Sequence, residues 1–126
     1  MPRIVGAWAA VAAAVALATA QGQAAAHALV LESQPAQDAK LTEPPPHVFL
    51  RFNSKLEKEL SHVTLSADKG KPVALPIPVN GQERADRITL PLAPLGPGAY
   101  VVRYKVLAVD GHITEGMLRF SVLGPK

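Results

Sequence analysis

Short runs in which apolar and polar residues alternate fill most of the chain after its first quarter. The longest covers residues 99–109, where every second residue from Tyr100 to Ala108 is apolar or aromatic. Residues 47–52 and 117–123 alternate in the same way. Because a period of two turns one face of a strand toward a core, each run predicts a half-buried β-strand.

Weaker runs complete this pattern, and proline- or glycine-containing segments separate them. Strands are also expected over residues 28–32, 60–66, 73–79 and 87–92. Proline cannot donate a ladder hydrogen bond, so the three prolines within or beside residues 73–79 predict an edge strand or an extended loop there. Residues 54–60 predict a single helical turn, since Leu56 and Leu60 are spaced as on one helix face.

About seven short strands separated by turns predict an all-β fold. The pattern favours an antiparallel Greek-key β-sandwich or barrel of the immunoglobulin-like or cupredoxin-like type. We find no internal repeat, and 126 residues are enough for one domain and not for two.

The first 26 residues follow a different pattern. Arg3 precedes an uncharged, Ala-rich run over residues 4–20, and three alanines end the segment at Ala26. A basic start, an apolar centre and small residues at the end predict a secretory signal peptide over residues 1–26. The domain would then cover residues 27–126 and be exported to the periplasm.

Two alternatives to this cleavage stay open. The apolar run is close to the lower limit of about 17 residues for a membrane-spanning helix, so it could anchor the chain instead. Cleavage could also follow Ala28, since small residues stand at the required positions there as well. Only cleavage after Ala26 makes His27 the first residue of the exported protein.

Composition narrows the possible chemistry. The chain has no cysteine, which excludes disulfides and thiolate metal sites. Without Arg3, twelve basic residues face ten acidic ones, and no basic run is present, so no nucleic-acid partner is expected.

Three residues could together bind a metal ion: His27, Asp110 and His112. Asp110 and His112 end the longest run, and continued strand geometry would point both side chains to one side of Gly111. As an N-terminal residue, His27 would offer its α-amine and its imidazole. Three nitrogens and a carboxylate oxygen suit copper(II), although zinc also accepts such ligands.

Other interpretations of these residues compete with a metal site. Asp-Gly is a common turn pair, so the domain could be a metal-free immunoglobulin-like interaction module. An amine-imidazole copper site also occurs in polysaccharide monooxygenases, but Asp110 would take up the position that oxygen needs, so we expect neither an enzyme nor a polysaccharide ligand. His47 and His62 are expected to be solvated side chains, and Glu32 and Glu115 could support a ligand by hydrogen bonding.

The sequence from residue 27 onward resembles the CopC family of periplasmic copper-resistance proteins over nearly its whole length. The resemblance rests on four segments in the family's order: His-Ala-Leu-Val-Leu-Glu-Ser-Gln-Pro-Ala from His27, Pro-Pro-His-Val-Phe-Leu-Arg-Phe from Pro45, Gly-Ala-Tyr to Val-Asp-Gly-His over residues 98–112, and Gly-Met-Leu-Arg-Phe-Ser-Val from Gly116. It implies that His27, His112 and the oxygen ligand Asp110 bind one copper(II) ion per chain. It further implies a monomeric copper carrier or buffer that acts with a CopD-like inner-membrane protein.

Some residues depart from the family pattern. Met117 is the only methionine after residue 26, so we expect a copper(II)-only form without a multi-thioether copper(I) site. Asn53-Ser54 stands where many members have a glutamate, Tyr104 replaces a usual tryptophan, and Ile113 replaces a frequent proline.

Overall fold

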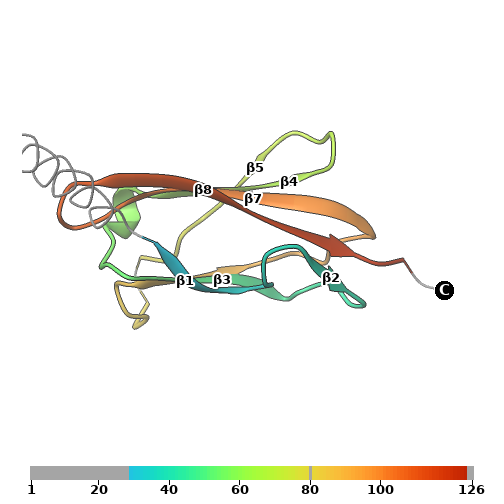
Figure 1. Ribbon diagram of the computed structural model, residues 1–126, viewed down its shortest axis with the longest axis horizontal. Helices are drawn as coiled ribbons and strands as arrows, with labels where there is room; N and C mark the ends of the chain where they lie inside the picture. Colours follow the sequence, from blue (N-terminus) through green and yellow to red (C-terminus); the bar gives the residue numbers. More distant parts are fainter. Residues whose placement is uncertain (1–28, 80, 125–126) are drawn as a thin grey trace, which may run out of the picture.

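The computed structural model describes residues 29–79 and 81–124, which form two β-sheets packed face to face (Figure 1). The strands are β1 (Val30–Gln34), β2 (Ala39–Leu41), β3 (His47–Phe52), β4 (His62–Ala67), β5 (Val73–Leu75), β6 (Arg87–Pro91), β7 (Gly98–Leu107) and β8 (Ile113–Val122), with one 3-10 turn, η1 (Lys58–Leu60). One sheet has the order β1-β3-β6 and the other β2-β8-β7-β4-β5. The predicted all-β sandwich is confirmed, and the sheets do not close into a barrel.

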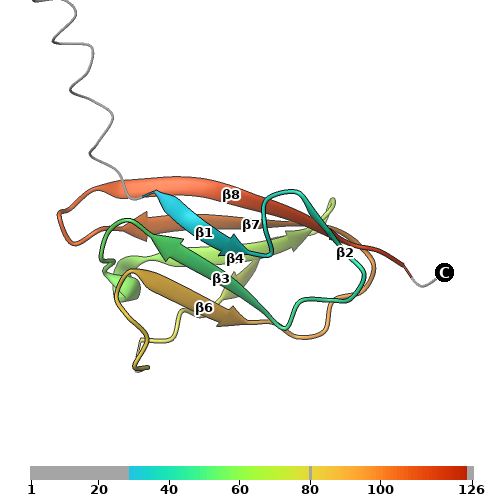
Figure 2. The same ribbon diagram turned by 60° about the horizontal axis from the view of Figure 1, so that its bottom comes forward.

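All strand pairs are antiparallel except one, which is β2 with β8. The chain leaves β1 in the three-stranded sheet, turns, and continues as β2 beside β8 in the other sheet (Figure 2). This short parallel strand is the addition to the seven predicted ones. Three residues are too few for an alternating pattern to reveal a strand, so the sequence did not predict it.

The core lies between the sheets and follows the predicted alternation. On β3, Val48, Leu50 and Phe52 are each at most 1% exposed. The buried apolar residues contributed by the other strands and loops are Leu56, Val63, Ile88, Leu90, Val102, Val106, Ala108, Leu118, Phe120 and Val122. The inward faces predicted for the strands over residues 47–52, 99–109 and 117–123 are therefore confirmed.

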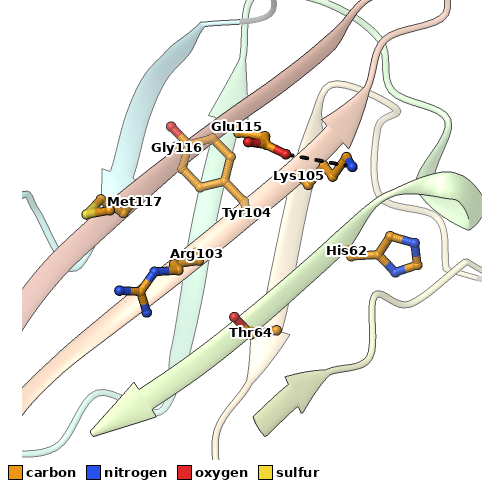
Figure 3. Close-up of a pocket in the computed structure, with 8 residues that line it drawn as sticks. All are labelled: His62, Thr64, Arg103, Tyr104, Lys105, Glu115, Gly116 and Met117. Atoms are coloured by element: carbon orange, nitrogen blue, oxygen red, sulfur yellow. Dashed lines mark ion pairs between the residues drawn. The ribbon is translucent and has the colours of Figure 1, made fainter. Parts of the chain in front are cut away.

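Tyr104 and Gly116 show how closely the sheet packs on itself. They are direct partners on β7 and β8, and the tyrosine ring lies over the glycine (Figure 3). A Cβ atom at Gly116 would overlap that ring. The same ring meets Phe52 of the opposite sheet edge-on, with 5.8 Å between ring centroids. Glycine at this position therefore lets one aromatic ring bridge the two sheets.

Several strand ends differ from the predicted ones. The predicted helical turn is present as η1, so β4 starts at His62, and Leu60 is 62% exposed. β8 starts four residues earlier than predicted. The alternating pattern did not reveal these four residues, because the inward positions among them are occupied by Thr114 and Gly116, which are not apolar side chains. Of residues 73–79, only Val73–Leu75 form a strand, β5, and it lies at the outer edge of its sheet, as predicted. Within the described residues, no helix has the length and apolar character of a membrane span.

Candidate metal site

The chain between β7 and β8 folds into a tight turn that carries Asp110 and His112. The Ala108 N–H donates to the His112 carbonyl at 2.9 Å, and the Gly111 N–H donates to the Ala108 carbonyl at 2.9 Å. Gly111 has a φ of +94°, a conformation that glycine adopts without a steric penalty. The turn therefore depends on glycine between the two candidate ligands.

This turn brings the two candidate ligands into direct contact. The Asp110 Oδ1 accepts a hydrogen bond from the His112 backbone N–H at 3.1 Å and lies 3.2 Å from the His112 Nδ1. Both side chains are about half exposed. Asp110 and His112 were expected to meet because a strand continued through them. They meet instead because β7 ends at Leu107 and the aspartate side chain closes a turn on the residue two positions ahead.

The environment of Asp110 favours its charged form. The pKa of the Asp110 carboxyl lies below its ordinary value, mainly because the His112 backbone N–H donates to it, with a smaller effect of the His112 imidazole. A carboxylate must be ionised to bind a metal ion. The Nδ1 atom is the ring nitrogen of His112 that lies against Asp110.

A short segment after β3 connects this turn to the beginning of β1. Asn53 accepts a hydrogen bond from the Leu29 N–H through its side-chain Oδ1 at 2.8 Å, and its own N–H donates to the Leu29 carbonyl at 3.0 Å. Two residues later, the Lys55 carbonyl accepts from the Val109 N–H at 3.0 Å, and Leu56 forms a β-bridge with Ala108. The first described residue and the turn are thus held by the same segment, at one end of the sandwich (Figures 1 and 2).

Ser61 fixes the strand that leads into the turn. Its hydroxyl donates to the Glu57 carbonyl at 2.9 Å and accepts from the Leu107 N–H at 3.0 Å, and the side chain is buried. The Glu57 N–H also donates to the Leu107 carbonyl at 2.8 Å. Both the N–H and the C=O of Leu107, the last residue of β7, are therefore hydrogen-bonded immediately before the chain turns.

The structure describes two of the three residues of the predicted metal set. Asp110 and His112 lie together, whereas His27 lies outside the described residues. Among the residues that are described, no three histidine, aspartate or glutamate side chains form a cluster that could hold a metal ion.

The remaining candidate residues lie elsewhere on the surface. Glu32 forms an ion pair with Arg51 at 3.2 Å, and Glu115 forms one with Lys105 at 3.7 Å (Figure 3). His62 is exposed, as expected, and lines an open groove of about 480 Å³ on the outer face of β4, β7 and β8. Figure 3 shows that this groove contains neither Asp110 nor His112.

The sequence analysis missed the structural roles of Asn53, Lys55 and Ser61. Asn53 was noted only as a departure from a family pattern. An asparagine directly after a strand is a residue that readily bonds nearby backbone groups, and this was the available signal. The role of Lys55 depends on its backbone carbonyl, which no side-chain pattern can reveal.

The fold and the turn define a class of protein: an open immunoglobulin-like sandwich with an Asp-Gly-His turn beside the start of its first strand. The family model for the CopC domain matches residues 30–123, and the chain belongs to this family.

Similar proteins agree with this assignment. Copper resistance protein C of Xanthomonas campestris pv. juglandis is 30% identical over 114 residues, which cover 86% of this chain and 89% of that protein. Protein YobA of Escherichia coli (strain K12) is 36% identical over 99 residues, which cover 77% and 79%. The crystal structure of CopC from Methylosinus trichosporium OB3b has a TM-score of 0.72 at 29% identity, covering 79% of this chain and 97% of that one. PcoC from Escherichia coli shares the fold, with a TM-score of 0.62 at 24% identity, covering 77% and 99%.

Proposed function

We propose that this protein is an exported, non-enzymatic carrier or buffer for copper(II) that binds one ion per chain. The ligands would be the α-amine and imidazole of His27, the imidazole of His112 and the carboxylate of Asp110. Membership of the CopC family and the similarity to copper resistance protein C support copper as the cargo. The donor set supports the copper(II) state, which prefers nitrogen and oxygen ligands.

One observation carries the proposal: the same segment, Asn53 to Leu56, binds both the first described residue and the Asp110–His112 turn. His27 precedes Leu29 by two residues. Two residues of extended chain span at most about 7 Å, so an N-terminus at His27 would begin no farther than that from the point where Leu29 is held. That point is joined to Val109, the residue before Asp110, through the Lys55 carbonyl.

The proposal requires cleavage after Ala26, because only a free α-amine can bind copper together with its own imidazole. An added residue ahead of His27 would convert that amine into an amide. Delivery would go to a CopD-like inner-membrane protein from the periplasm, in keeping with a predicted signal peptide over residues 1–26.

The test uses protein exported to the periplasm and loaded with one equivalent of copper(II). Native mass spectrometry should show a chain that begins at His27 and retains one copper ion, and electron paramagnetic resonance should count three nitrogen ligands. His112→Ala and a variant with one alanine ahead of His27 should each weaken copper binding at least 100-fold in competition with a chelator, or about 2.7 kcal/mol.

His62→Ala is the matched control, since His62 is exposed and lies outside the turn. It should leave copper affinity unchanged. A chain that begins at Leu29, or equal affinity in all three variants, would contradict the proposed site and favour a metal-free interaction module.

A further inference from the structure

One edge of the five-stranded sheet is only partly covered. β2 pairs with β8 at Phe120–Val122 and ends there. From Ile113 to Met117, no strand of the described chain lies beside β8 on this edge, because β1 belongs to the opposite sheet (Figure 2). We call the stretch from Ile113 to Met117 the open edge; its first residue directly follows His112.

The side chain of Gln37 is hydrogen-bonded to the backbone of β8 on this edge. Its side-chain Nε2 donates to the Met117 carbonyl at 3.1 Å, and its Oε1 accepts from the Arg119 N–H at 2.7 Å. These are the two hydrogen bonds that the N–H and C=O groups of one residue in a parallel neighbouring strand would make. The protein thus uses a side-chain amide in place of a strand immediately before β2 begins.

The alternation of strand hydrogen bonds extends this pattern toward the turn. The Met117 carbonyl and the Arg119 N–H point away from β7, so Ile113 and Glu115 direct their N–H and C=O groups to the same side. Within the described chain, no backbone or side-chain group bonds to this side of Ile113 or Glu115. Such unpaired rows of donors and acceptors are templates for an added strand.

Apolar side chains next to the open edge would also gain from being covered. Ile113 is 54% exposed and Met117 is 40% exposed. Leu31 of β1 is 54% exposed, and it lines, together with Met117, a slot of about 250 Å³ between β1 and β8. An extended chain on the open edge would remove part of this surface from water, which is favourable.

The geometry points to β-strand addition: the open edge binds an extended segment of the protein that exchanges copper with this chain. The identity of that partner rests on the proposed function, whereas the binding mode rests on the edge itself. The position suits exchange, since the bound segment would lie directly beside the residue that follows His112.

Charge favours a different protein over a second copy of this chain. Two open edges paired antiparallel about Glu115 would place two carboxylates directly opposite each other, and like charges in that arrangement repel. We therefore expect a partner segment with a neutral or basic residue opposite Glu115 and β-branched residues beside it.

A defined peptide tests the binding mode. The probe is a capped nonapeptide, Lys-Val-Thr-Val-Gln-Val-Thr-Val-Lys, and its control carries N-methyl groups on all seven residues between the two lysines, which removes the central donors on both edges. The parent peptide should bind and slow amide hydrogen exchange at Ile113, Glu115 and Met117. The N-methylated peptide should bind at least tenfold more weakly.

Two variants at residue 115 separate the contribution of the backbone N–H to peptide binding from that of the side chain. Glu115→Pro removes an outward N–H without cutting a bond to β7, a substitution that edge strands tolerate. It should weaken peptide binding at least tenfold. Glu115→Ala also loses the ion pair with Lys105 but keeps the N–H, and it should change peptide affinity less than twofold.

The outcomes distinguish this inference from the proposed function. Absent binding, equal binding of the two peptides, or slowed exchange at amides outside the open edge would overturn strand addition. Self-association in sedimentation that Glu115→Pro abolishes would also overturn it, in favour of a second copy as occupant. Loss of copper binding with intact peptide binding would count against the copper proposal alone.

Discussion

The interior between the sheets and the turn between β7 and β8 are stabilised in different ways. In the interior, Phe52, Val102 and Phe120 are at most 2% exposed and packed among other apolar side chains. In the turn, Asp110 and His112 are about half exposed and are held by hydrogen bonds at the protein surface. Changes in the interior should therefore affect folding, whereas changes in the turn should affect ligand binding with little effect on folding.

Removal of a core ring should give the largest loss of stability. Phe52→Ala should lower the free energy of unfolding by about 3–5 kcal/mol, because a buried aromatic ring leaves a cavity. Urea denaturation would measure it. Leu60→Ala is the control: this leucine is 62% exposed, and its loss should change stability by no more than about 0.5 kcal/mol. Similar losses in the two variants would break the contrast between interior and surface.

Addition of one methyl group should have a smaller effect. Gly116→Ala places a Cβ atom within the Tyr104 ring and should cost about 2–3 kcal/mol, as overpacking of a core does. Thermal unfolding of the single variant and of Gly116→Ala combined with Tyr104→Ala would separate the two contributions. In the Tyr104→Ala background, Gly116→Ala should change the stability very little. If the stability losses of the two substitutions were additive, the contact with the Tyr104 ring would not be what restricts residue 116 to glycine.

Ser61 is a polar residue of the interior and gives an intermediate case. Ser61→Ala leaves the Leu107 N–H without its partner and should cost on the order of 1–2 kcal/mol. Ser66→Ala is the control variant, because Ser66 is also a buried serine. Amide hydrogen exchange should quicken at Leu107 only in the Ser61 variant, and unchanged exchange there would contradict the role given to its hydroxyl.

Protonation of Asp110 should have the smallest effect. Since its pKa is lowered in the folded protein, the turn is favoured above the ordinary aspartate pKa and loosens as the pH falls through the lowered value. Carboxyl NMR of the metal-free protein should find Asp110 titrating below a typical aspartate. Most of this depression should persist in His112→Ala, since the backbone N–H remains; titration at the ordinary value in the unsubstituted protein would contradict it.

The two regions were also predicted unequally well from the sequence. Strands whose inward residues are apolar, such as β3 and the C-terminal part of β8, were located with their buried faces, because alternation reports directly on burial. The N-terminal part of β8 was missed, because Thr114 and Gly116 break that alternation. Gly116 lies against an aromatic ring that only the folded structure brings to it.

The convergence of Asp110 and His112 was predicted from continued strand geometry, and the structure brings the two side chains together by a turn. Asp110 and His112 were chosen because carboxylate and imidazole groups bind metals, and the structure shows them in contact through a turn. The hydrogen bonds from Asn53 to Leu29 and from Val109 to Lys55 join residues far apart in the sequence. No local pattern specifies such pairs, so the connection between the first strand and the turn required the structure.

The parallel pair of β2 and β8 has a mechanical consequence. β2 lies near the beginning of the folded domain, β8 is its last strand, and the two run in the same direction. Tension applied to the two ends of the domain would pull these strands in opposite directions along their length. Their hydrogen bonds would then be loaded together in shear and not opened one after another, so the pair should act as a clamp that resists forced extension.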